Sequence, residues 1–146
     1  MLNAMMAVAL LLAAPPPAPL VNPAAPALFE RYVALEHAFD PAVADLYADT
    51  ALIKNRRTYP TGQVREATLP ATKYKEIIRT AMPVAKARDD RSLYSTVTYT
   101  PEGTGVRIKA SRYSVLKQYT SPISLLVAPD PKGTWLIVEE ITESRP

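Results

Sequence analysis

An amide, a guanidinium and a phenol alternate along one short stretch of the sequence. Asn55, Arg57 and Tyr59 are spaced two residues apart in a run that is typical of a β-strand. Side chains with this spacing lie on one face of a strand, so the three would form a polar wall. Such a wall could bind a carboxylate or a phosphate, because a guanidinium donates paired hydrogen bonds to either group. The alternative is an edge strand with solvated charges, since Lys54 and Arg56 lie beside them.

Two consecutive carboxylates, Glu139 and Glu140, lie in the last apolar run of the chain. In a strand they must point to opposite faces of the sheet. A carboxylate that faces a cavity beside Arg112 would form a buried ion pair or an acid–base group, and burial would raise its pKa. The alternative is a cross-strand salt bridge on the open face of the sheet. The sequence leaves open which of the two faces inward, and we select Glu140 as the candidate pocket residue.

Tyrosines supply the remaining candidate groups. Tyr32 could point its hydroxyl into a cavity, or it could pack its ring and leave the hydroxyl at the rim. Tyr99, Tyr113 and Tyr119 could line a pocket for a ring-bearing or lipid-like ligand, or pack on the sheet with their hydroxyls in water. The candidate ligand pocket consists of seven residues: Tyr32, Asn55, Arg57, Tyr59, Tyr99, Arg112 and Glu140.

Several kinds of chemistry are excluded by composition. Cysteine is absent from the 146 residues, and His37 is the only histidine. Disulfides, thiolate catalysis and clusters of imidazole ligands are therefore excluded. The four glycines never cluster, and phosphate-loop, dinucleotide and metal-ligand patterns are missing. We therefore predict no cofactor and no metal site, and we expect His37 at the surface.

The net charge is only +3, but it is unevenly distributed. Residues 51–117 contain fourteen bases and five acids, whereas residues 28–50 and 118–146 are both net acidic. A basic middle could attract an anionic ligand, or its charges could pair across the fold. The basic helical face expected within residues 69–87 has no aromatic neighbour except Tyr74, which the core requires, so we expect no nucleic-acid partner.

The first 27 residues contain no charged side chain. Residues 4–14 have the length of a signal-peptide core and are too short to span a bilayer. A proline-rich linker follows, and residues 25–27 offer small side chains for cleavage, although the usual basic residues before such a core are missing. We expect a leader at 1–27, a domain at 28–146 and a periplasmic or secreted protein. The alternative is a floppy tail on a cytoplasmic protein.

The first half of the domain has helical patterns around one strand. Apolar residues at helical spacing predict a helix over residues 28–39. Asp40 can cap a second, short helix, with Pro41 in its first turn. We expect a strand over residues 51–59 and a third helix over 69–87, which Pro83 should kink or end early.

After residue 90 the apolar period changes to two, which predicts strands. We expect strands at 93–100, 106–119, 122–128 and 134–142. Strict alternation places Tyr94 and Tyr99 on opposite faces. The order predicts an α+β fold in which three N-terminal helices pack on a curved antiparallel sheet. Such a cone would leave a pocket between the helices and the sheet.

Three short segments carry a family resemblance: RYVAL at 31–35, LYADTA at 46–51 and GTWLI at 133–137. They resemble the nuclear transport factor 2-like (NTF2-like) superfamily, which includes ketosteroid isomerases and SnoaL-like polyketide cyclases. The resemblance covers about residues 28–142 and implies the cone-shaped fold. It implies little about activity, because this fold hosts many functions.

The resemblance also argues against isomerase chemistry. It implies that Tyr32 donates a hydrogen bond to a substrate oxyanion. The aspartate that serves isomerases as general base corresponds to Asn55, and an amide cannot accept that proton near neutral pH. A second, acidic oxyanion donor is expected within 106–119, where the sequence offers only Lys109 or Arg112. The related cyclases use a strand histidine, whereas His37 lies near the end of the first predicted helix.

The sequence favours an exported, non-catalytic domain that binds a small apolar or anionic molecule in its cone. Arg57 or Arg112 would hold the negative group. A second interpretation is an isomerase- or dehydratase-like enzyme with atypical residues, in which Glu140 is the base and Tyr32 the oxyanion donor.

A third interpretation is a protein-interaction domain that forms a homodimer. The open face of the sheet would be its contact surface, and the cone would be filled by side chains. Two faces of the strand at 122–128 are candidates: one with Ile123, Leu125 and Val127, and its neighbour with Leu126.

Overall fold

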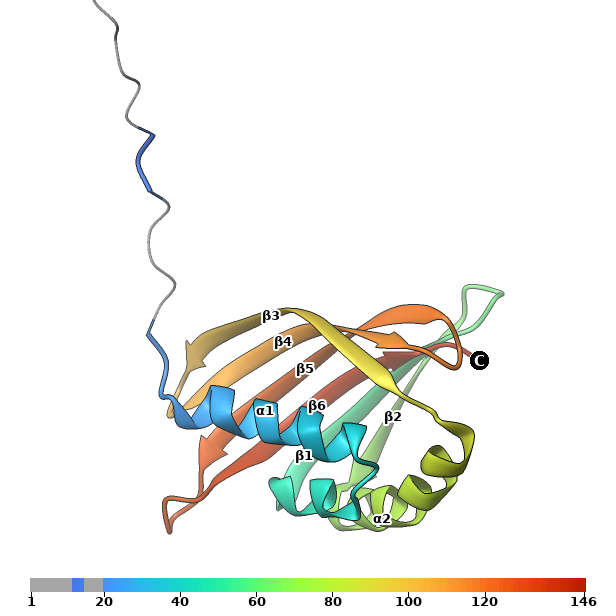
Figure 1. Ribbon diagram of the computed structural model, residues 1–146, viewed down its shortest axis with the longest axis horizontal. Coiled ribbons are helices and arrows are strands. Elements are labelled where there is room, and N and C mark those ends of the chain that lie inside the picture. Colours follow the sequence, from blue (N-terminus) through green and yellow to red (C-terminus); the bar gives the residue numbers. More distant parts are fainter. Residues whose placement is uncertain (1–11, 15–19) are drawn as a thin grey trace, which may run out of the picture.

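The computed structural model describes residues 12–14 and 20–146, and the predicted leader core and most of the linker lie outside them. Helices cover one face of a single curved sheet (Figure 1). The elements are α1 (Ala24–His37), the 3-10 helix η1 (Pro41–Leu46), β1 (Tyr47–Thr58), β2 (Val64–Pro70), α2 (Ala71–Arg88), β3 (Ser92–Glu102), β4 (Gly105–Ser114), β5 (Tyr119–Pro129) and β6 (Trp135–Ser144).

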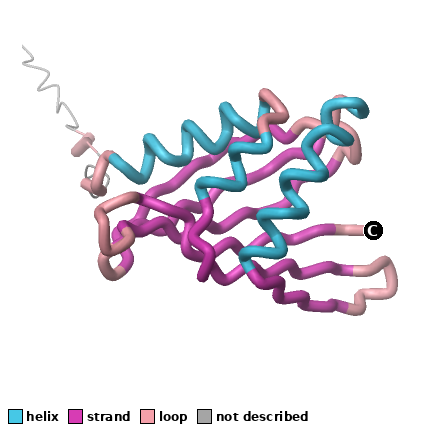
Figure 2. The backbone as a smooth tube through the Cα atoms, turned by 90° about the horizontal axis from the view of Figure 1, so that it is seen from below, coloured by secondary structure: helices cyan, strands magenta, loops and turns pink. Residues whose placement is uncertain are grey.

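The sheet has the strand order β2-β1-β6-β5-β4-β3. The strands β1 and β6 pair in parallel, and the other neighbours pair antiparallel. The N-terminal hairpin is thereby joined edge to edge with the C-terminal strands. Seen from below, α1, η1 and α2 all lie on the same side of the sheet (Figure 2). This side is called the inner face below.

The core lies between the helices and the inner face. Its central side chains, Ile108, Leu125, Val127 and Ile137, are at most 1% exposed. They come from three adjacent strands at alternating positions, as a half-covered sheet requires. Burial of one such side chain stabilises the fold by about 1.5–3 kcal/mol. No helix in the described part of the chain is long and apolar enough to cross a membrane.

The α+β class is confirmed, but the detail of three N-terminal helices is not. The second helical segment is a six-residue 3-10 helix, and Asp40 caps it as expected by accepting a hydrogen bond from the Ala42 N–H at 2.9 Å. A strand missed by the sequence reasoning, β2, precedes α2. The helix α2 continues through Pro83 to Arg88, so the predicted early end is wrong. Ile78 and Met82 pack on the core and hold this part of the helix in place.

The predicted strand over residues 106–119 is in fact two strands. The strand β4 ends at Ser114, and β5 begins at Tyr119 after a turn. The turn is closed by a 2.8 Å hydrogen bond from the Gln118 N–H to the Ser114 carbonyl. Gln118 has a φ of 54°, so the turn uses a left-handed residue other than glycine. Residues 115–118 contain no glycine or proline, so the sequence does not signal this turn.

A bulge in β3 breaks the strict alternation predicted there. The register to β4 shifts between Ser95 and Thr98, and Thr96 has a φ of 52°. Such a bulge adds one residue to a strand and turns the following side chains to the other face. As a result, Tyr94 and Tyr99 both pack on α1, and their predicted placement on opposite faces is wrong.

The structure separates the two candidate faces of β5. Ile123, Leu125 and Val127 point at the helices and are at most 2% exposed, so they cannot be a partner surface. Leu126 alternates with them and lies on the open face. Its register partners Arg107 and Glu139 join in a salt bridge of 3.0 Å. The open face is therefore charged as well as apolar.

Candidate functional site

A buried carboxylate lies in the middle of the inner face. Glu140 is 2% exposed, and its neighbours in register, Ile53 and Leu125, are apolar. Its two oxygens accept hydrogen bonds from the hydroxyls of Tyr47 and Tyr74, the latter at 2.7 Å. Burial raises the pKa of Glu140, and the two tyrosine hydrogen bonds partly offset this rise. The site is thus a carboxylate held in the core by two phenols.

A second carboxylate lies beside the first. Glu36 of α1 accepts a hydrogen bond of 2.7 Å from the Tyr94 hydroxyl. Arg112 is paired with Tyr94 across β3 and β4. Burial alone lowers the pKa of Arg112, but Tyr32, Tyr94 and the carboxylates together raise it. Glu36 and Glu140 thus favour the charged form of Arg112 through their negative potential, although no salt bridge joins Arg112 to a carboxylate in the described part of the chain.

The tyrosines of this region remain protonated donors at neutral pH. Burial raises the pKa values of Tyr32, Tyr47 and Tyr74 well above 10.0, and the nearby carboxylates raise them further. Tyr32 and Tyr47 are at most 4% exposed, so side chains fill this part of the cone. We call this group the tyrosine–carboxylate cluster; its members are Tyr32, Glu36, Tyr47, Tyr74, Tyr94, Arg112 and Glu140.

The structure brings together only some of the seven predicted pocket residues. Tyr32, Arg112 and Glu140 belong to the cluster. Tyr99 does not belong to the cluster; it is half-buried against Phe29 of α1, with a ring centroid distance of 6.5 Å. Asn55 and Arg57 lie farther along β1, at positions that alternate with the buried Ile53, and Tyr59 follows the end of that strand.

Sequence reasoning missed Glu36, Tyr47, Tyr74 and Tyr94 as members of the site. The sequence did offer one signal for two of them. Tyr47 follows the apolar residues of η1 at the start of β1, Tyr74 falls on the apolar face of α2, and a buried tyrosine hydroxyl usually needs a polar partner. The partner, Glu140, lies 66 to 93 residues away in the sequence.

Beyond the helices the inner face becomes polar. Asn55 donates a hydrogen bond of 2.9 Å to the Thr142 hydroxyl, and it accepts one of 3.0 Å from Ser144. Arg57 is paired with Ser144 in the register of β1 and β6. Its guanidinium lies 5.7 Å from the centroid of the Tyr59 ring, and that of Arg65 lies at 5.5 Å.

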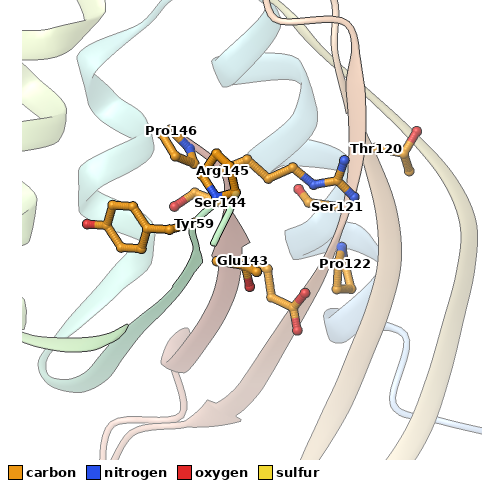
Figure 3. A pocket seen from close by; sticks show the side chains of 10 residues that line it. Tyr59, Thr120, Ser121, Pro122, Glu143, Ser144, Arg145 and Pro146 are labelled. Carbon is orange, nitrogen blue, oxygen red and sulfur yellow. The ribbon is translucent and has the colours of Figure 1, made fainter. Parts of the chain in front are cut away.

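A recess of about 480 Å³ lies where β6 ends (Figure 3). Arg145 reaches across it toward Ser121, whereas Tyr59 points away on the other side. The Arg145 guanidinium lies 5.5 Å from the centroid of the Tyr119 ring. In the part of the chain that is described, no salt bridge involves Arg145. We call this the β6-end recess, lined by Thr58, Tyr59, Pro60, Thr120, Ser121, Pro122, Glu143, Ser144, Arg145 and Pro146.

The consecutive glutamates lie one on each face of the sheet, and the cross-strand salt bridge expected on the open face is present. Glu140 points inward to the cluster. Glu139 points outward and accepts a hydrogen bond of 3.0 Å from Arg107, which also bonds Glu102. This open-face network is a cross-strand salt bridge.

The remaining titratable candidates do not form a metal site. His37 is exposed, and its Nε2 donates a hydrogen bond of 2.8 Å to the Ser92 carbonyl. Within residues 12–14 and 20–146, no group of three or more histidine, aspartate or glutamate side chains is placed to hold a metal ion.

Solved structures share this architecture. An NTF2-like protein of unknown function from Pseudomonas putida KT2440 superposes with a TM-score of 0.62 at 12% identity, covering 82% of this chain and 83% of that one. The protein has the NTF2-like fold. A provisionally assigned ketosteroid isomerase from Shewanella frigidimarina gives a TM-score of 0.57 at 17% identity, covering 82% and 94%.

A provisionally assigned dehydratase of the NTF2-like family from Streptomyces avermitilis gives a TM-score of 0.55 at 9% identity, covering 82% and 92%. No protein-family model and no curated protein sequence matches the chain. At these identities the likeness establishes the NTF2-like fold alone, and function has to be argued from this chain's own residues.

Proposed function

We propose that the protein binds a small anionic molecule in the β6-end recess. The observation that carries this proposal is the position of Arg145, which lies in the recess beside Ser121 without a salt bridge in the described part of the chain. A guanidinium next to hydroxyl donors suits a carboxylate or a phosphate. The volume of about 480 Å³ falls within the range of small-molecule sites.

The charges along the inner face favour this end over the cluster. Arg57 and Arg65 contact the ring of Tyr59, which points away from the recess, so they act on this end of the molecule only through their positive potential (Figure 3). Arg112, in contrast, already faces Glu36 and Glu140. An anion at Arg112 would meet two carboxylates, so of the two arginines expected to hold the negative group, Arg57 is better placed.

Binding is favoured over catalysis because the buried carboxylate is closed off. A general base must come within hydrogen-bond reach of the proton that it removes. Glu140 is 2% exposed, and both of its oxygens already accept hydrogen bonds from Tyr47 and Tyr74. Asn55 occupies the position that the isomerase resemblance assigns to the base, and an amide cannot serve there.

The test is calorimetric titration of the full chain with propionate, benzoate and inorganic phosphate. At about 100 times its dissociation constant, a bound anion adds about 2.7 kcal/mol to the free energy of unfolding, which a thermal shift also detects. Arg145→Gln should abolish binding. Arg88→Gln, an exposed arginine at the end of α2, is the matched control and should leave it unchanged. Equal binding by all three proteins, or no binding of any anion, would overturn the proposal.

Export is proposed on the composition of the leader alone. The helix α1 begins at Ala24 and Ala25 is fully buried, so cleavage after Ala27 would remove the first turn of α1. Expression of the full chain in bacteria, followed by mass measurement of the periplasmic fraction, tests both export and the cleavage position. A full-length chain found only in the cytoplasm would contradict export.

A further inference from the structure

The β6-end recess contains a negative as well as a positive group. Glu143 lines it together with Arg145, two residues further along the chain. Their charged ends reach toward the same side of β6, where Ser121 and Pro122 of β5 lie (Figure 3). The two nevertheless form no salt bridge with each other, as far as the described residues show. A gap is therefore left between a guanidinium and a carboxylate.

Two further basic residues lie near Glu143 but form no salt bridge with it in the described part of the chain. Arg56 is its partner in the register of β1 and β6, and Lys109 lines a second recess with it on the open face. The carboxylate of Glu143 is thus available to a ligand, as is the guanidinium of Arg145.

We propose that the ligand of this recess is a zwitterion, namely a small amino acid or a related amino carboxylic acid. Its carboxylate binds Arg145 and its ammonium binds Glu143. This inference rests on the proposed function and specifies the class of its ligand. The hydroxyl of Ser121, toward which Arg145 reaches, is a further hydrogen-bond partner for the ligand (Figure 3).

The opposed charges make a zwitterion the best match. A simple anion is attracted by Arg145 but repelled by Glu143. A simple cation is attracted by Glu143 but repelled by Arg145. A ligand that carries both charges gains both attractions and suffers less repulsion. The walls suit a small side chain, because Pro60, Pro122 and Pro146 present apolar rings without backbone N–H groups.

The test compares alanine with its two halves. Alanine, propionate and ethylamine differ only in the ammonium and carboxylate groups, and each is titrated calorimetrically into the full chain. We expect alanine to bind at least tenfold more tightly than propionate and ethylamine. Glu143→Gln should weaken alanine to the level of propionate without weakening propionate. Arg145→Gln should remove the binding of both, whereas Arg88→Gln should change neither.

The outcomes separate this inference from the proposed function. If propionate binds as tightly as alanine and depends on Arg145, the anion site stands and the zwitterion proposal is overturned. If neither compound binds, both proposals fall. Because the comparison of the three compounds is made on the unchanged protein, it does not depend on whether a variant folds. A series from glycine to β-alanine and γ-aminobutyrate then measures the separation of the two charged groups that the recess prefers.

Discussion

The tyrosine–carboxylate cluster and the β6-end recess contain the same kinds of charged and polar groups. They differ in whether those groups find their partners within the protein. In the cluster, both oxygens of Glu140 and one of Glu36 accept tyrosine hydrogen bonds, and the two carboxylates contribute to raising the pKa of Arg112. In the recess, Arg145 and Glu143 lie side by side without a salt bridge in the described residues. Burial accounts for this difference.

A buried charge without partners costs several kcal/mol, so a core must satisfy it internally. None of the buried side-chain nitrogens and oxygens of the described residues lacks a hydrogen-bond partner. At the end of β6, water satisfies a charge until a ligand replaces it. The cluster is therefore expected to govern stability, and the recess is expected to govern binding.

Removal of Glu140 should give the largest loss of stability. Glu140→Ala deprives Tyr47 and Tyr74 of their acceptor and leaves Arg112 facing one carboxylate instead of two. Each buried hydroxyl left without an acceptor costs about 1–3 kcal/mol, so we expect the free energy of unfolding to fall by about 2–6 kcal/mol, measured by urea denaturation. Glu143→Ala, on the same strand, should change it by no more than about 0.5 kcal/mol. If both variants lowered the free energy of unfolding by similar amounts, the expected difference between the cluster and the recess would be wrong.

Alkaline pH should unfold the protein through the cluster. The pKa values of Tyr32, Tyr47 and Tyr74 are raised well above 10.0 in the folded state, chiefly by burial. Above pH 10 the unfolded chain releases protons that the folded chain keeps. The contribution of each tyrosine is thus fully present below pH 10 and is lost above it at up to about 1.4 kcal/mol per pH unit.

Tyrosinate absorbance and far-ultraviolet circular dichroism, recorded together against pH, test this prediction. The buried tyrosines should ionise in one step that coincides with loss of secondary structure. Ionisation of all tyrosines before any loss of structure would show that the cluster is open to solvent.

The sequence predicts more of the fold than of the candidate site. The α+β class follows from the change of apolar period near residue 90, and the cap at Asp40 was predicted from two adjacent residues. The strand β2 was missed because nearly all of its side chains are exposed, which leaves no apolar alternation. The split between β4 and β5 was missed because Gln118 makes the turn without glycine.

The cluster could be predicted only in part, because its contacts join distant segments. Alternation suggested that one of the two consecutive glutamates faces inward near Arg112, which is where Glu140 lies. That Tyr74 reaches Glu140 depends on how α2 crosses the sheet, and that Tyr94 reaches Glu36 depends on a bulge. The recess depends on where β6 ends relative to its neighbours, and no local pattern encodes that position.

A smaller effect should distinguish the charge of Glu140 from its hydrogen bonds. Burial raises the pKa of Glu140 above 4.5, so between pH 4.5 and its folded value the native state binds a proton that the unfolded state releases. The Glu140 contribution to stability is therefore greatest below pH 4.5 and declines as pH rises through that window. Relative to Glu140→Gln, the wild type should lose at most about 1.4 kcal/mol per pH unit. Urea denaturation from pH 4 to pH 8 measures this slope, and a constant difference would contradict the raised pKa.

Only a small effect on stability is expected at Arg145, where the effect on binding should be largest. Among the described residues, the Arg145 guanidinium makes one specific contact, with the Tyr119 ring, whose centroid lies 5.5 Å away. An exposed contact of this kind contributes about 0.5–1 kcal/mol, so Arg145→Gln should lower the free energy of unfolding by no more than that. Arg112→Gln should cost more, because Glu36 and Glu140 would lose the charge that faces them. If Arg145→Gln destabilised the fold as much as Arg112→Gln, the recess would belong to the structural network, and its free guanidinium would no longer argue for a ligand.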